Sequence, residues 1–243
     1  CICKYLCLIS IIAVVTCCSY CYSIDSAQPE YADGIPLKHA DAQQLEPAVA
    51  KSDSGNILLA WVEGDKSKEV FEIYANKIDK YGKLLWQNSG VKVCAFSSDK
   101  HDPAIASDGK GGAIVVWVDD RDNVEKSFIT RHIFCQHISA EGKLLWNQNG
   151  VSVCLTKHWT PDDRVDYSPI IPKIAGDGNG GAIITWMDGR SSPDKDSGRN
   201  MDIYCQKIGN SGKPEWQENG IPICTTKESQ KDPELISDNS GGA

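Results

Sequence analysis

The chain has 243 residues, of which 41% are hydrophobic and 24% are charged, and its formal net charge at pH 7 is −8. This is the composition of a folded protein, and it excludes an intrinsically disordered chain. An acidic surface repels phosphate backbones, so we expect no nucleic-acid partner.

The first 24 residues have the plan of an export signal. Lys4 precedes an uncharged stretch from Tyr5 to Ile24, whose centre, Leu6 to Val15, is strongly apolar. A basic residue, a short apolar core and then small or polar residues are typical of a signal peptide. Two alternatives stay open: a lipoprotein modified at Cys17, and a membrane anchor, since about twenty uncharged residues can just span a bilayer. In each case the protein is exported, and it is either secreted or held at the cell surface.

The rest of the chain is built from an internal repeat. Four stretches share one pattern, and they begin at Glu46, Asp102, Ile171 and Asp232; a proline is followed by a Gly-rich turn and, in the first three, by an apolar run that ends in tryptophan. A second block follows each of the first three and places a tryptophan eight residues before a cysteine, in the pairs Trp86 and Cys94, Trp146 and Cys154, and Trp216 and Cys224. We therefore expect repeats at about residues 33–94, 95–154, 155–224 and 225–243, the last holding only the start of a unit.

Each repeat predicts about four strands and no helix. In the second repeat, 104–106 predicts a short strand, and 113–118 is the continuous apolar, β-branched run typical of a strand buried on both faces. The segment 133–138 alternates more and predicts a half-exposed strand. The segment 144–154 predicts a fourth strand, interrupted by a tight turn at Asn149–Gly150.

Four-stranded units with a fixed tryptophan predict the blades of a β-propeller. A single blade cannot bury both of its faces, so neighbouring blades must stack. The fold class we expect is all-β, with residues 25–243 forming an incomplete propeller of three four-stranded blades plus the start of a fourth. A β-solenoid or a string of small sandwiches is the structural alternative.

The unit resembles a repeat common in secreted bacterial propeller proteins, with the core P…SDGxGGAxxxWxDxR…IYxQxI…GxxxWxxNGxxVC. The second repeat carries this core on Pro103, Ser107 to Gly112, Trp117, Asp119, Arg121, Gln136, Trp146, Asn149 and Cys154. The resemblance covers about residues 33–243. It implies a propeller-like fold and export, but no particular activity. The Asp-box of sialidases is not matched, because Trp117 lies nine residues after Asp108, farther than that motif allows.

Residues that recur in every repeat are expected to hold the blade, because chemistry normally needs one asymmetric place. The charged ends of the buried strands, Asp119 with Arg121 and Asp188 with Arg190, are therefore predicted to be structural pairs. The insertion after Cys154 is asymmetric, and it contains His158, Trp159, Asp162, Asp163, Arg164, Asp166 and Tyr167. Aromatic faces beside carboxylates suit a sugar or a peptide, so we predict a ligand-binding loop; a solvated linker is the alternative.

Two further patterns bear on metals and disulfides. The loop 176–181 predicts a plain hairpin turn, so we expect no metal or cofactor; Ca²⁺ held by Asp177 and Asn179 is the alternative. Five cysteines lie outside the leader, without zinc spacing: Cys94, Cys135, Cys154, Cys205 and Cys224. In an exported protein, Cys135 with Cys154 and Cys205 with Cys224 are candidate disulfides. The alternative is that each is a small buried apolar residue.

These patterns favour an exported propeller that binds or scaffolds a glycan or a protein at the cell surface, with no identifiable catalytic site. The second interpretation is a propeller-type glycan hydrolase or lyase, with active residues in the 158–167 loop or in blades outside this chain. Acids that differ from blade to blade and converge on the axis would favour this second interpretation.

Overall fold

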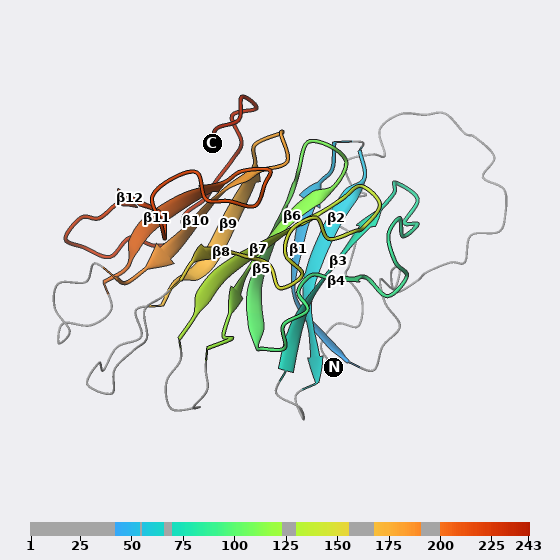
Figure 1. The fold of residues 1–243 in the computed structure, drawn as a ribbon, viewed down its shortest axis with the longest axis horizontal. Helices are drawn as coiled ribbons and strands as arrows, with labels where there is room; N and C mark the ends of the chain where they lie inside the picture. Colours follow the sequence, from blue (N-terminus) through green and yellow to red (C-terminus); the bar gives the residue numbers. More distant parts are fainter. Residues whose placement is uncertain (1–41, 54, 66–69, 123–129, 156–167, 191–199) are drawn as a thin grey trace, which may run out of the picture.

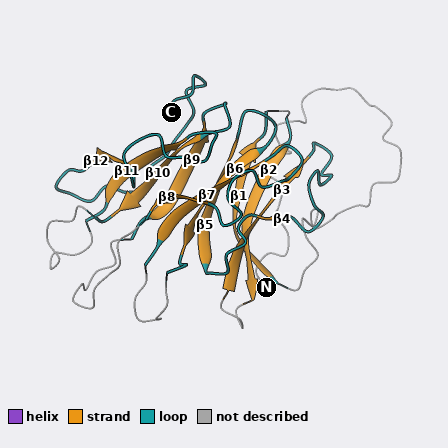
Figure 2. Cartoon of the chain, in the orientation of Figure 1, coloured by secondary structure: helices purple, strands orange, loops and turns teal. Residues whose placement is uncertain are grey.

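The computed structural model describes residues 42–53, 55–65, 70–122, 130–155, 168–190 and 200–243. The predicted signal segment 1–24 lies outside these ranges, as do His158, Trp159, Asp162, Asp163, Arg164, Asp166 and Tyr167. In the described part of the chain every regular element is a strand (Figure 2). No helix in those residues is long and apolar enough to cross a membrane.

The strands form three antiparallel four-stranded sheets, one from each full repeat (Figure 1). Sheet 1 contains β1 (Gln43–Lys51), β2 (Ile57–Asp65), β3 (Val70–Ile78) and β4 (Val91–Lys92). Sheet 2 contains β5 (Lys100–Ser107), β6 (Ala113–Asp119), β7 (His132–Ile138) and β8 (Val151–Cys154). Sheet 3 contains β9 (Ile170–Gly176), β10 (Ala182–Asp188), β11 (Asp202–Ile208) and β12 (Ile221–Cys224). Strands pair in chain order within each sheet, so the all-β class and the four strands per repeat are confirmed.

The sheets pack face to face, and their first strands, β1, β5 and β9, lie side by side (Figure 1). Successive side chains of β6 enter opposite cores, because side chains alternate across a strand. Val115 and Trp117 join the core shared with sheet 1, whereas Ile114 and Val116 join the core shared with sheet 3. Every residue of β6 is buried, as its continuous apolar run predicted.

The third and fourth strands differ from the sequence prediction. All seven residues of β7 are buried, so the half-exposed strand expected at 133–138 is wrong. Its alternating polar residues are satisfied inside the protein: the side-chain amide of Gln136 donates to the carbonyl of Asn147 at 2.7 Å, for example. The fourth strand is only β8, and Leu144 makes no more than an isolated bridge to Ile138.

The recurring tryptophan of the second block forms a hydrogen bond to the next sheet. Nε1 of Trp86 in sheet 1 donates to the carbonyl of Ala140 in sheet 2 at 3.0 Å, and Nε1 of Trp146 donates to Asn210 in sheet 3 at 2.9 Å. The ring of Trp86 lies over Gly142, where a Cβ would approach it to 2.8 Å. The fixed tryptophan and the following glycine turn are therefore two halves of one inter-sheet contact.

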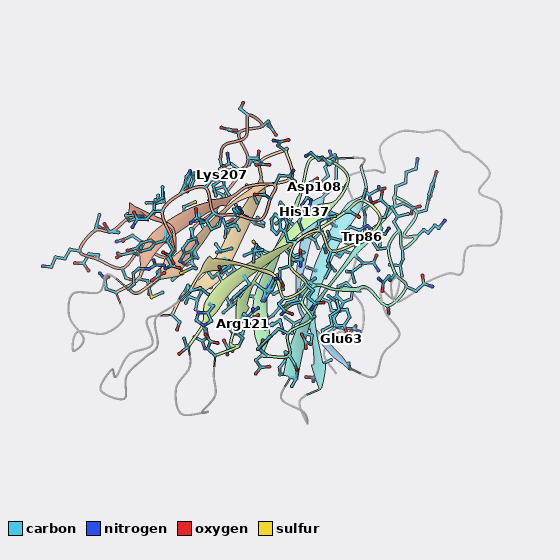
Figure 3. The ribbon with its side chains drawn as sticks, viewed as in Figure 1. Glu63, Trp86, Asp108, Arg121, His137 and Lys207 are labelled. Atoms are coloured by element: carbon cyan, nitrogen blue, oxygen red, sulfur yellow. The ribbon has the colours of Figure 1, made fainter. Side chains whose placement is uncertain are left out.

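The two ends of the sheets differ. At one end the first and second strands join in a Gly-rich turn, in which the Asp108 carboxylate accepts the amides of Lys110 and Gly112, both at 2.8 Å. Asp108 and His137 mark this end in Figure 3, whereas Glu63 and Arg121 mark the opposite end. At that opposite end each second strand finishes and each third strand begins. The linking sequences there differ in length between repeats, so the sequence variation concentrates at this end.

Candidate functional site

A groove of about 430 Å³ runs along the three first strands where they lie side by side. Its lining comes from equivalent positions of successive repeats: Glu46 to Val49, Asp102 to Ile105, Ile171 to Ile174, and Glu234 with Leu235. We call it the axial groove, because the first strands of successive repeats converge here and each contributes to its lining.

Each first strand is irregular where it lines the groove. The pairing of β1, β5 and β9 with their second strands shifts around the proline, as in a β-bulge. The residue before that proline has a positive φ in every repeat: 49° at Glu46, 51° at Asp102, 53° at Ile171 and 52° at Asp232. Proline suits this place, because it has no amide hydrogen to donate and β1, β5 and β9 are edge strands. In each repeat the bulge changes the direction of the side chain that precedes the proline.

These bulge residues link neighbouring sheets. The amide of Asp102 donates to Oε2 of Glu46 at 2.7 Å, and the amide of Ile171 donates to the carboxylate of Asp102. We call this series of amide-to-carboxylate bonds the axial ladder. It stops at Ile171, whose side chain has no oxygen, and the amide of Asp232 donates instead to the sulfur of Met187 at 3.4 Å.

His101, whose position is occupied by histidine in one repeat only, contacts the carboxylate of Asp102. The Nδ1 atom of His101 lies 3.6 Å from Oδ2 of Asp102, and its Nε2 atom lies 3.3 Å from Oδ1 of Asp120. Burial alone would lower the pKa of His101, but the hydrogen bonds to the two carboxylates outweigh it and raise the pKa to about 9. The hydrogen bond from His101 in turn lowers the pKa of Asp102. Near neutral pH the groove therefore contains an ionised Asp102 beside a protonated histidine.

The other first strands have no histidine at this position. Its counterparts are Leu45, Ile170 and Lys231. Aligning the four stretches shows this difference, so a signal for His101 was present in the sequence. The sequence prediction did not include His101, because it placed the asymmetry in the long insertion and not inside the repeated blocks.

The charged residues at the ends of the buried strands are structural, as predicted. In sheet 2, Nη2 of Arg121 lies 2.7 Å from Oδ2 of Asp119, which also accepts Nε1 of Trp117 at 2.9 Å. In sheet 3, Asp188 binds Arg190 and accepts Nε1 of Trp186. Burial would raise the pKa of Asp119, but hydrogen bonds from Arg121 and Trp117 keep it below its usual value. These carboxylates are occupied within their own sheet and are not available to a substrate.

The two candidate disulfides are not formed, and all five cysteines of this part of the chain are free. Residue 133, not Cys135, lies opposite Cys154, and residue 203, not Cys205, lies opposite Cys224. Strand spacing then puts the Cα atoms of each pair roughly 8 Å apart, which is too far for a disulfide.

The cysteine that ends the second block of one repeat instead contacts the strand-end arginine of the next repeat. Nη2 of Arg190 lies 2.8 Å from Sγ of Cys154, and Nη2 of Arg121 lies 3.9 Å from Sγ of Cys94. Burial raises the pKa of Cys154 to about 12, so its sulfur stays a neutral thiol at physiological pH. The recurrence of cysteine thus reflects packing between sheets.

The loop 176–181 is the hairpin turn that we predicted. The Asp177 carboxylate accepts the amides of Asn179 and Gly181 at 2.7 and 2.9 Å, so that Oδ1 atom is already occupied. Among the residues that the structure describes, no group of three or more His, Cys, Asp or Glu side chains is arranged to hold a metal ion.

No family model matches the sequence, and no curated protein matches it. Several solved structures do match. The GH93 α-L-arabinofuranosidase of Fusarium graminearum is 14% identical over 74% of this chain and 50% of its own, with a TM-score of 0.49. An α-L-arabinofuranosidase from Lactobacillus brevis is 10% identical over 78% and 60%, with a TM-score of 0.47. An endo-1,5-α-L-arabinanase from Thermotoga petrophila is 16% identical over 76% and 44%, with a TM-score of 0.43.

This chain spans about half the length of the GH93 enzyme. The named enzymes among these similar structures are glycoside hydrolases, and this finding corrects our expectation of a non-catalytic binding or scaffold module. The likeness lies in the fold and by itself assigns no function to this chain.

Proposed function

We propose that this chain is part of a β-propeller that hydrolyses a glycan, and that the axial groove forms part of its glycan site. The observation that carries this proposal is the asymmetry at one repeated position. Glu46, Asp102 and Ile171 occupy equivalent places in the three bulges, line the same groove, and are all different. Acids that differ from repeat to repeat and converge on one axis are what an enzyme needs and a repeated scaffold does not.

The propeller arrangement is supported by the segment that follows sheet 3. Asp232 repeats the positive φ of the earlier bulges, and Asp238 repeats the Gly-rich turn by accepting the amides of Ser240 and Gly242. Residues 232–242 therefore have the backbone of another first strand and its turn, beside β9. We take them as the start of a fourth blade, in line with the resemblance to secreted propeller repeats.

The proposed chemistry uses the two carboxyl groups that line the groove, Asp102 and Glu46. Glycoside hydrolases pair an ionised carboxylate with a carboxylic acid that protonates the leaving oxygen. Asp102 suits the ionised role, since His101 and the amide of Ile171 both lower its pKa. Glu46 is our candidate for the acid. Its Oε2 atom already accepts the amide of Asp102, so the proton would be carried on Oε1.

The proposed partner is a glycan outside the cell, and export rests on the predicted leader, residues 1–24. The mechanism needs no metal or other cofactor, because the two carboxyl groups perform both proton transfer and attack. The loop 158–167, with its tryptophan, tyrosine and aspartates, lies outside the described residues and stays a predicted ligand-binding loop.

The experiment is a hydrolysis screen of the 243-residue chain on a panel of polysaccharides that includes arabinan, galactan, xylan and mixed-linkage glucan. We expect new reducing ends from at least one of them, and a loss of at least about 100-fold in rate for Asp102→Asn. Glu141→Gln is the matched control, since Glu141 is an exposed acid bound to Ser139 in a turn outside the groove. No turnover of any substrate, or full activity in Asp102→Asn, would overturn the proposal.

A further inference from the structure

Ile171 occupies a backbone conformation that suits its side chain poorly. It has a φ of 53°, and β-branched residues with positive φ are true outliers, because the branched Cβ crowds the backbone. The other three repeats place an acidic residue at this position, and two of these residues, Asp102 and Asp232, are aspartates, which tolerate this region better. Strain of this kind persists where the residue serves the site.

Ile171 also breaks the axial ladder. Without a carboxylate here, the amide of Asp232 has only the thioether of Met187 as acceptor, which is a weak one. An aspartate at position 171 would continue the ladder and relieve the backbone. Isoleucine at position 171 therefore lowers the stability of the fold in two ways, through backbone strain and through the missing acceptor for the amide of Asp232.

The groove shows what the isoleucine provides. At the bulge positions that line the groove, Glu46 and Asp102 place carboxylates on the side of the first two repeats, whereas Ile171 places an apolar side chain on the side of the third. A sugar ring has the same two-sided character, with hydroxyl donors at its rim and C–H groups on its faces. The carboxylates accept hydroxyl protons, and the apolar side covers a C–H face.

The charge of the groove selects among sugars. Lys173 is the one cation among the lining residues, and its Nζ atom pairs with Oε1 of Glu234 at 3.3 Å. A sugar that bears a carboxylate would therefore meet three acidic side chains, Glu46, Asp102 and Glu234, while the cation of the lining is already paired.

We propose that Ile171 is a specificity-determining residue of the axial groove: it replaces a ladder carboxylate with an apolar wall, so that the groove takes uncharged sugars and rejects uronic acids. This inference rests on the proposed function, and it names the ligand class of the same site. It predicts that Ile171→Asp increases the stability of the protein and weakens its binding of neutral sugars.

The test uses the 243-residue chain and two matched pairs of oligosaccharides, galacto- with galacturono- and gluco- with glucurono-. We expect the wild-type chain to bind at least one neutral member at least about tenfold more tightly than its uronate counterpart. Ile171→Asp should raise the melting temperature, because it completes the ladder, and should weaken neutral binding by about tenfold or more. Ile223→Asp is the control: the side chain is exposed on β12, outside the groove, and should change neither quantity.

The outcomes separate the two proposals. Neutral binding that survives intact in Ile171→Asp, or equal binding of a uronate, overturns the role of Ile171 and leaves the glycan function standing. A lower melting temperature for Ile171→Asp contradicts the ladder argument. If neither pair binds and the hydrolysis screen is also negative, the proposed function fails, and this inference fails with it.

Discussion

Each repeat uses acidic residues in two opposite ways. At the end of the buried strand, Asp119 and Asp188 are held by a tryptophan and an arginine of their own sheet, in nearly the same arrangement. At the axial bulge, Glu46 is exposed, Asp102 is shared with a histidine, and the third position is Ile171. The identical set is buried and bound to its own tryptophan and arginine, whereas the varied set lines a groove. Constancy across repeats therefore marks packing in this protein, and variation marks the candidate site.

The largest effect should come from removing a buried strand-end acid. Asp119→Ala would leave the Arg121 guanidinium and the Trp117 indole without their carboxylate inside the protein, so we expect a loss of about 3–5 kcal/mol in the free energy of unfolding. Glu46→Ala, at the exposed axial acid, removes one amide acceptor and should lose no more than about 1 kcal/mol. Urea unfolding of both variants checks the contrast. Equal losses would mean that the axial acid is as structural as the buried one.

A second contrast compares two glycines that share one backbone conformation. Gly142 has a φ of 79° and a Cβ there would lie 2.8 Å from the Trp86 ring, whereas Gly178 has a φ of 74° and nothing within 4 Å. Gly178→Ala should lose about 1–2 kcal/mol from backbone strain alone. Gly142→Ala should lose about 2–4 kcal/mol, because it also displaces the tryptophan that joins sheets 1 and 2.

Thermal unfolding, followed together with Trp fluorescence, measures both variants. If Gly142→Ala and Gly178→Ala lose the same free energy of unfolding, the contact between Trp86 and Gly142 does not stabilise the packing of sheets 1 and 2. In that case the recurrence of tryptophan in the second block would need another explanation.

The contrast between constant and varied positions also explains how far the sequence could be interpreted. The repeat, the all-β class and the fully buried β6 followed from periodicity, because each depends on residues close together in one repeat. The contact between Cys154 and Arg190 was missed, because it joins two repeats and no pattern within one repeat contains it. The same holds for the axial ladder: Asp102 bonds to Glu46, 56 residues earlier, through a bulge that only the three-dimensional register reveals.

The smallest expected effect concerns the pH dependence of stability, which tests whether His101 belongs to the site. The pKa of His101 is raised to about 9, so the native state binds its proton more tightly than the unfolded chain, whose histidine has a pKa of about 6.5. The stabilisation is therefore complete below about pH 6.5 and is lost as the pH rises through about 9. We expect on the order of 1–2 kcal/mol between pH 6 and pH 10, after allowing for solvent screening of this partly exposed group.

The matched variant is His101→Gln, which keeps a polar side chain but cannot take up the proton. The difference in unfolding free energy between wild type and variant should shrink as the pH rises from 6 to 10. Taking this difference isolates the effect of His101, because the titration of lysines and tyrosines is common to both proteins. A constant difference would show that His101 is not protonated between Asp102 and Asp120. Asp102 would then lose the partner that contributes most to its low pKa, and the ionised role proposed for it would rest on the amide of Ile171 and the charge of Arg131.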